Sequence, residues 1–154
     1  MTLALSIPGL AELVLEHLLV DVNGTLTNRG ELLDGVEARL GRLSNALDIR
    51  LVSADTFGTL DTIAARMNVS AVRASTGEDK LRLLDELGRQ RCAAIGNGAN
   101  DALVLEAAAL SFAVIGPEGA SASALRSADV VCASAADALD LLLDPKALSA
   151  TLRP

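Results

Sequence analysis

The stretch Leu18-Leu19-Val20-Asp21-Val22-Asn23-Gly24-Thr25-Leu26-Thr27 decides the fold of this 154-residue chain. Its apolar beginning predicts a buried strand, which ends in the carboxylate of Asp21 and is followed at once by Asn-Gly-Thr. In α/β proteins, ligands bind just beyond the carboxyl ends of the strands. The stretch therefore predicts an acid able to act as a nucleophile at the mouth of an α/β sheet.

Outward from this strand, short apolar runs alternate with helical periods. The pattern predicts strands at 18–22, 49–53, 69–73, 92–95, 111–115 and 130–132, and helices at 35–47, 56–67, 80–87, 99–108, 119–126 and 135–143. Such alternation implies βαβ units and a mostly parallel sheet. The runs 3–7 and 13–15 flank Pro8-Gly9 and predict a small N-terminal β-hairpin. We expect a single domain over 1–154, with a hairpin extension at 1–16, a core at 17–143 and a C-terminal tail at 144–154.

The amino-acid composition argues against several classes of binding partner. Hydrophobic residues make up 51% of the chain, so a full core is possible, whereas aromatic residues at 1% argue against base stacking on single-stranded nucleic acid. A net charge of −7 disfavours nucleic acid and anionic membranes. Cys92 and Cys132 lack metal-ligand spacing and predict two buried thiols. With no leader-like start and no apolar stretch free of charge, we expect a cytoplasmic protein.

Four features fall at or just after predicted strand ends, where the functional residues of this architecture gather. They are Asp21 with Asn23, Ser53 with Asp55, Lys80, and the segment Gly96-Asn97-Gly98-Ala99-Asn100-Asp101. Each feature alone has an ordinary explanation, such as a turn residue, a helix cap or a solvated charge. Together and in this order, they indicate a phosphoryl-transfer site.

The chemistry of such a site suits these residue types. Asp21 could attack phosphorus and form an aspartyl phosphate, which divides one difficult step into two. Ser53 could donate a hydrogen bond to the transferred phosphoryl group, and Lys80 could offset the charge of both the phosphate and Asp21. Asp101 could serve a Mg²⁺ ion, either directly or by orienting Lys80, because Mg²⁺ favours oxygen ligands.

This constellation resembles the haloacid dehalogenase (HAD) superfamily of phosphotransferases. The superfamily shows Asp-x-Asp-Gly-Thr, then Ser or Thr, then Lys, then Gly-Asp-Gly-x-x-Asp or a variant. The chain is most similar to the phosphorylation domain of P-type ATPases, whose first motif, Asp-Lys-Thr-Gly-Thr-Leu-Thr, differs from Asp21–Thr27 only at Val22 and Asn23. Its fourth motif, Gly-Asp-Gly-x-Asn-Asp-Ala, differs from Gly96–Ala102 in specified positions only at Asn97. The resemblance spans roughly Leu18 to Leu143, and Ser53-Ala54-Asp55-Thr56 is similar to the Thr-Gly-Asp segment of that group.

The resemblance implies a HAD-like Rossmannoid three-layer sandwich and a Mg²⁺-dependent phosphohydrolase or phosphotransferase with a small phosphorylated substrate. It assigns residues to three groups by position in the motifs. The catalytic residues are Asp21, Asn23, Ser53 and Lys80; the phosphate-binding residues are Gly24, Thr25, Ala54, Asp55 and Asn100; the metal ligands are Asp21, Asn23, Asn97 and Asp101.

The spacing of the motifs also bears on substrate access. The gaps from Asp21 to Ser53 and from Ser53 to Lys80 leave no room for an inserted cap domain, so we expect a capless protein. The segment 28–34, expected to be a loop, is the one obvious candidate to line an entrance. Capless members of the superfamily often exclude water by oligomerising or by acting on large substrates, which predicts a homo-oligomer.

Two asparagines depart from the motifs of the superfamily. Asn23 replaces the usual general acid and base, so we expect slow hydrolysis and a preference for good leaving groups such as acyl phosphates. Asn97 replaces a metal-ligand Asp, so we expect weak Mg²⁺ binding. Both precede glycine, and Asn-Gly pairs are prone to deamidation, which would regenerate Asp. Two alternatives therefore remain open: a catalytically weak or inactive HAD domain that binds phosphate or a protein partner, and a purely structural α/β domain.

Overall fold

The computed structural model describes residues 1–154 and is built on a six-stranded sheet of order β10-β9-β8-β3-β6-β7. Every pair of neighbouring strands in it is parallel, which confirms the predicted sheet. The strands are β3 (His17–Asp21), β6 (Asp48–Ser53), β7 (Ser70–Arg73), β8 (Cys92–Gly96), β9 (Leu110–Val114) and β10 (Val130–Cys132). The strand that carries Asp21 is thus central, with β6 on one side and β8 on the other.

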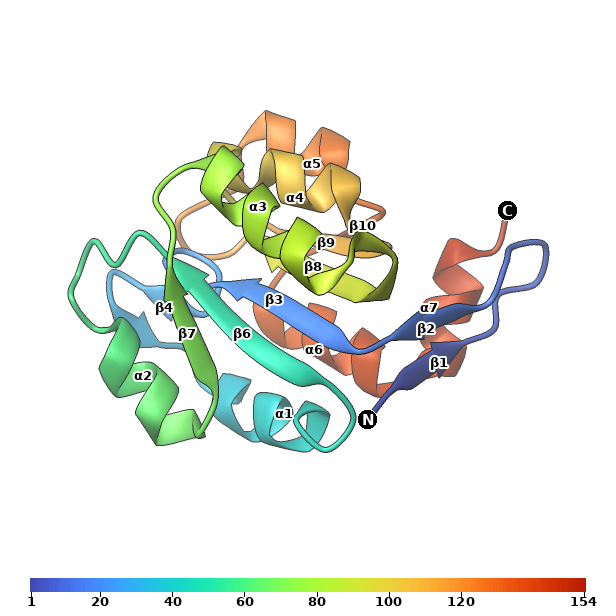
Figure 1. Cartoon of the computed structure of the whole chain (residues 1–154), viewed down its shortest axis with the longest axis horizontal. Helices are drawn as coiled ribbons and strands as arrows, with labels where there is room; N and C mark the ends of the chain where they lie inside the picture. The colour runs from blue at the N-terminus through green and yellow to red at the C-terminus, as the bar shows by residue number, and fades with distance from the viewer.

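Helices cover both faces of the sheet, as the predicted three-layer sandwich requires (Figure 1). One layer holds α1 (Val36–Leu43), α2 (Leu60–Met67) and α6 (Ala135–Leu143), and the other holds α3 (Gly77–Leu87), α4 (Ala102–Ala107) and α5 (Ala122–Ser127). Side chains of β3 alternate between the two apolar cores. Leu18 and Val20 belong to one core and Leu19 to the other, because successive strand residues point to opposite faces.

The strand order reverses next to β3. The chain runs outward from β3 to β6 and β7, crosses through α3 to β8 on the other side of β3, and continues outward to β9 and β10. Such a reversal opens a crevice at the carboxyl ends of the two strands where it occurs. Asp21 ends β3 and Gly96 ends β8, so both sequence motifs meet at that crevice.

No domain is inserted at either position where a cap could stand. Between β3 and β6 the chain forms only a small hairpin and α1, and between β6 and β7 only α2. The hairpin pairs β4 (Thr27–Asn28) with β5 (Glu31–Leu32), so the segment expected to be a loop at 28–34 is partly strand. Its two-residue turn, Arg29-Gly30, has positive φ at both positions, the backbone that closes a tight hairpin.

The N-terminal hairpin and the C-terminal helix lie side by side at one end of the molecule (Figure 1). The N-terminal hairpin is confirmed and pairs β1 (Leu3–Leu5) with β2 (Leu13–Leu15). The expected C-terminal tail instead contains a helix, α7 (Pro145–Leu152), which packs against α6. Pro145 ends one helix but suits the first turn of the next, and Asp144 caps that turn by accepting from the Ala147 N–H at 3.2 Å. None of the helices combines the length and apolar character needed to cross a bilayer.

Candidate active site

Three charged side chains from distant parts of the sequence meet at the crevice. The Lys80 Nζ donates to Asp21 Oδ1 at 2.9 Å and to Asp101 Oδ1 at 2.7 Å. All three residues are buried, with 3% of the Lys80 residue surface exposed. A buried lysine between two carboxylates is a costly arrangement that folding alone does not require, and such arrangements concentrate at functional sites.

Local structure explains how Lys80 and Asp101 reach this position. The hydroxyl of Thr76 accepts from the Asp79 N–H at 3.1 Å, so Thr76 caps the start of α3 and Lys80 lies in the first turns of that helix. Asp101 ends the short 3₁₀ helix η2 (Ala99–Asp101), and its Oδ2 accepts from the backbone N–H groups of Asn97 and Gly98 at 3.0 and 2.9 Å. Both oxygens of Asp101 are therefore engaged, one by the loop and one by Lys80.

A second set of contacts links the first and fourth motifs. The Thr25 Oγ1 lies 3.1 Å from Asp21 Oδ2 and 3.2 Å from Asn97 Oδ1. Thr25 is fully buried, and Gly24 before it has a φ of +77° that ordinary side chains rarely adopt. A Cβ at position 24 would come within 2.6 Å of Asn97 Nδ2, so glycine is also required by space.

Ser53 lies at the carboxyl end of β6, one residue beyond the partner of Asp21 in the parallel register. It is buried, and its Oγ accepts from the Asp55 N–H at 2.9 Å. Its own hydroxyl hydrogen has no acceptor within the protein. A hydroxyl oriented in this way has a donor left for a ligand at the crevice.

Asp55 occupies a structural position in the loop after β6. Its Oδ1 accepts from the Leu60 N–H at 3.0 Å, at the start of α2, and its Oδ2 accepts from Arg73 Nε at 3.2 Å. The hydrogen bond from Leu60 and the charge of Arg73 hold the pKa of Asp55 below its usual value. Its φ of +59° is one that Asp and Asn tolerate better than most residues.

The other predicted site residues lie outside this network of contacts. Ala54 and Asn100 are exposed, and their side chains make no hydrogen bond to the Asp21 cluster. Asn23 is half-buried beside Gly24, and its side chain makes no hydrogen bond within the protein. Their proposed roles in phosphate or metal binding remain predictions.

The electrostatics of the cluster are set by burial. Burial and the nearby charge of Asp101 raise the pKa of Asp21 to about 7, although Lys80 and Thr25 act in the opposite direction. Burial alone would lower the pKa of Lys80, but the two carboxylates outweigh it and raise that pKa above its usual value. Lys80 is therefore a permanent cation, and Asp21 titrates near neutral pH.

Sequence reasoning missed the loop between β9 and α5. The Asn97 Nδ2 donates to Gly119 O at 3.0 Å, and the Ser121 N–H donates to Asn97 O at 2.8 Å. The Arg29 N–H at the hairpin turn donates to Glu118 Oε2 of the same loop at 3.3 Å. The rule that placed Asp21 at the carboxyl edge of the sheet applies equally to the end of β9, so the signal was present.

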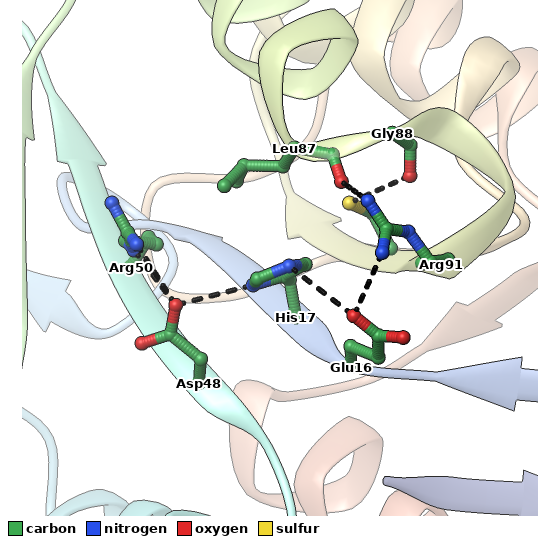
Figure 2. A network of polar contacts seen from close by, with 8 residues as sticks. Glu16, His17, Asp48, Arg50, Leu87, Gly88 and Arg91 are labelled. Carbon is green, nitrogen blue, oxygen red and sulfur yellow. Dashed lines mark hydrogen bonds and ion pairs between the residues drawn. The ribbon is translucent and has the colours of Figure 1, made fainter. Parts of the chain in front are cut away.

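A different polar network occupies the opposite edge of the sheet (Figure 2). His17 begins β3, and its Nδ1 lies 3.1 Å from Asp48 Oδ2, which also accepts from Arg50. Glu16 pairs with Arg91 at 3.1 Å on the other side of His17. His17 thus joins neighbouring elements at the amino ends of the strands, away from Asp21.

The structure contains no cluster of three or more His, Cys, Asp or Glu side chains placed to hold a metal ion. The oxygens that face one another across Thr25 are those of Asp21 and Asn97, a carboxylate and an amide. Oxygen donors of this kind suit Mg²⁺, which keeps several waters and needs few protein ligands.

Several solved structures share the fold of this chain. The chain superposes on the cobalt-bound deoxy-D-mannose-octulosonate 8-phosphate phosphatase of Haemophilus influenzae with a TM-score of 0.71 and 16% identity, over 91% of this chain and 94% of that one. The Moraxella catarrhalis 3-deoxy-D-manno-octulosonate 8-phosphate phosphatase, in complex with magnesium, phosphate and KDO, gives 0.70 and 16%, over 90% and 94%. The catalytic domain of the CPx-ATPase CopB-B gives 0.59 and 22%, over 77% of this chain and 46% of that one.

These superpositions define the class: the chain has the fold of the HAD superfamily. Searched against protein-family models, it matches none. It is 46% identical over 78 residues to the uncharacterized protein MJ0073 of Methanocaldococcus jannaschii, over 48% of this chain and 84% of that protein. The chain belongs to the same family as MJ0073.

Proposed function

We propose that this protein is a HAD-type phosphohydrolase or phosphotransferase that acts on a small phosphorylated substrate through an aspartyl phosphate at Asp21. The observation that carries the proposal is the buried Lys80 held between Asp21 and Asp101 at the switch point of the sheet. The fold is shared with phosphatases of octulosonate 8-phosphate, which supports a reaction of this class without identifying the substrate.

In the first step, an oxygen of Asp21 attacks phosphorus. A bond forms between that oxygen and phosphorus, and the bond from phosphorus to the leaving oxygen breaks. The leaving group takes its proton from solvent, because the amide of Asn23 cannot supply one. In the second step, the oxygen of a water molecule attacks the same phosphorus, the bond from phosphorus to Asp21 breaks, and the water's proton passes to solvent, which releases phosphate and restores the Asp21 carboxylate.

The neighbouring groups bind and orient the reacting atoms. Lys80 offsets the negative charge that accumulates near Asp21, and its position depends on Asp101. The free hydroxyl hydrogen of Ser53 is available to a phosphoryl oxygen, and Thr25 orients the second oxygen of Asp21. Positioning and charge stabilisation of this kind account for most catalysis of phosphoryl transfer.

Magnesium is the ion that this fold and donor set imply. Asp21 and Asn97, with Asn23, would hold it, and it would neutralise charge on the phosphoryl group. Asp101 is assigned to Lys80 rather than to the metal, because its Oδ2 accepts from two backbone N–H groups and its Oδ1 accepts from Lys80 at 2.7 Å, whereas each oxygen of Asp21 accepts a single hydrogen bond. With one carboxylate among its ligands, the site is expected to bind Mg²⁺ weakly.

The rate is expected to be low. General acid–base catalysis is typically worth about 10²–10⁴-fold, and Asn23 supplies none of it. Substrates whose leaving groups need little protonation, such as acyl phosphates and aryl phosphates, are therefore preferred. The missing cap leaves the mouth of the site open, so we further propose that the protein closes it by homo-oligomerisation, which light scattering would detect as a mass above that of one chain.

Phosphate release from acetyl phosphate and p-nitrophenyl phosphate, with and without Mg²⁺, tests the function. We expect Mg²⁺-dependent turnover that is lost in Asp21→Asn. Turnover that is equal in both proteins would exclude Asp21 as the nucleophile.

The second candidate function is a domain that binds phosphate or a protein partner without turnover, and the two asparagines favour it. It predicts no turnover in any variant, together with trapping of beryllofluoride at Asp21.

A further inference from the structure

Every polar group of Asn97 is engaged. Its N–H donates to Asp101 Oδ2 at 3.0 Å, and its carbonyl oxygen accepts from the Ser121 N–H at 2.8 Å. Its side-chain Nδ2 donates to Gly119 O at 3.0 Å, and its Oδ1 accepts from Thr25 at 3.2 Å. The carbonyl of Gly119 can only accept, so the NH₂ group must face it and Oδ1 must face Thr25.

The carboxamide is also confined by backbone. A Cβ at Gly24 would lie 2.6 Å from Asn97 Nδ2, and a Cβ at Gly116 would lie 2.9 Å from Gly24 O. The loop after β3 and the loop between β9 and α5 therefore approach each other closely, with the Asn97 side chain between them.

We propose that Asn97 is a positioning residue that ties the 116–121 loop to Thr25, and that this site requires an amide at position 97. An aspartate there would place a carboxylate oxygen against the carbonyl oxygen of Gly119, two acceptors with no hydrogen between them. The residue that departs from the superfamily motif is thus matched to its own surroundings. Asn97→Asp therefore loosens the site.

Asn97 acts on the nucleophile through Thr25. The Thr25 hydroxyl carries one hydrogen and lies within reach of two acceptors, Asp21 Oδ2 and Asn97 Oδ1. The carboxamide therefore fixes where the Thr25 hydroxyl stands relative to Asp21. Removing it frees that hydroxyl and the 116–121 loop together.

The same geometry protects Asn97 from deamidation. That reaction requires the backbone nitrogen of the following residue to attack the side-chain carbonyl. The Gly98 N–H instead donates to Asp101 Oδ2 at 2.9 Å, and the carboxamide is held by Gly119 and Thr25. Native protein is therefore expected to deamidate at Asn97 far more slowly than unfolded protein.

The test compares Asn97→Asp and Asn97→Ala with Asn45→Asp, a matched charge change at an exposed residue of another loop. Amide hydrogen exchange of residues 116–121, read at the Ser121 N–H, is measured without Mg²⁺ or substrate. We expect exchange at least about tenfold faster in both Asn97 variants, a Tm lower by about 4 °C, and no change in Asn45→Asp. Exchange and Tm equal to the wild type in Asn97→Asp would overturn the proposal.

Kinetic measurements distinguish a role of Asn97 in positioning Thr25 from a role in the stability of the fold alone. These measurements rest on the proposed function, whereas hydrogen exchange does not. In Asn97→Ala, kcat for p-nitrophenyl phosphate is expected to fall while KM changes little, and adding Asn97→Ala to Thr25→Val is expected to lower kcat no further. Additive losses would contradict action through Thr25. If the wild type has no turnover, the proposed function fails, while the exchange result still decides the role of Asn97.

Discussion

Lys80 and Asp21 lie 59 positions apart in the sequence, yet the lysine Nζ is 2.9 Å from the carboxylate and both residues are buried. The same Nζ is 2.7 Å from Asp101, so one cation serves two acids. In the absence of metal, the three groups carry a net charge of −1 when Asp21 is ionised.

Replacing Lys80 with methionine leaves two buried carboxylates with no cation. Removing one partner of a buried ion pair typically costs about 3–5 kcal/mol, so Lys80→Met is expected to lower the free energy of unfolding by that amount. Urea denaturation measures the change. The double variant Lys80→Met with Asp21→Asn is expected to recover part of the loss, because only one buried acid then remains. Equal stability of Lys80→Met and the wild type would contradict the arrangement.

Asp101→Asn is expected to disturb Lys80 more than it disturbs Mg²⁺. The amide keeps one oxygen for the N–H groups of Asn97 and Gly98 but loses the charge that holds Lys80. Titration calorimetry with Mg²⁺ should show a smaller loss of affinity for Asp101→Asn than for Asp21→Asn. A loss in Asp101→Asn as large as that in Asp21→Asn would instead mark Asp101 as a direct ligand.

Asp55→Asn tests a pH dependence. The pKa of Asp55 is held below its usual value by the Leu60 N–H and Arg73, so its stabilising effect is present above the unfolded pKa of about 3.9 and is lost as pH falls. Asparagine tolerates the same positive φ, so the variant isolates the charge. We expect a lower Tm than the wild type at pH 7 and a difference that shrinks as pH falls below about 3.9. A gap that does not depend on pH would exclude an effect of charge.

Gly24→Ala tests the close approach of the first and fourth motifs. Its Cβ would add a clash with Asn97 Nδ2 to the cost of a φ of +77°. Gly58→Ala is the matched control, since Gly58 has a φ of +67° but open space around it. Backbone strain alone costs about 1–2 kcal/mol, and both variants carry it. Gly24→Ala should therefore lower the free energy of unfolding more than Gly58→Ala does, because only Gly24→Ala adds the clash. Equal losses would mean that Asn97 moves aside freely.

Much of this architecture follows from local sequence patterns. The alternation of apolar runs with helical periods predicts the parallel sheet, and placement at strand ends brings Asp21, Ser53, Lys80 and Asp101 to one edge. The hydrogen bonds among these residues cannot be predicted from local sequence patterns. Asp101 is oriented toward Lys80 by hydrogen bonds from two backbone N–H groups of its own loop. The orientation of the Asn97 side chain depends on the carbonyl of Gly119, which lies 22 residues further along the chain. The sequence pattern also wrongly predicted a tail at 145–152, which forms a helix, because proline can end one helix and begin another equally well.

Mass mapping of the phosphorylated protein tests whether Asp21 carries the phosphoryl group. The protein is incubated with acetyl phosphate and Mg²⁺, quenched in acid and digested. We expect phosphate on the peptide that contains Asp21. It should be released by hydroxylamine, as an acyl phosphate is, and should be absent in Asp21→Asn. Phosphate on any other residue, or an equal amount in Asp21→Asn, would contradict it.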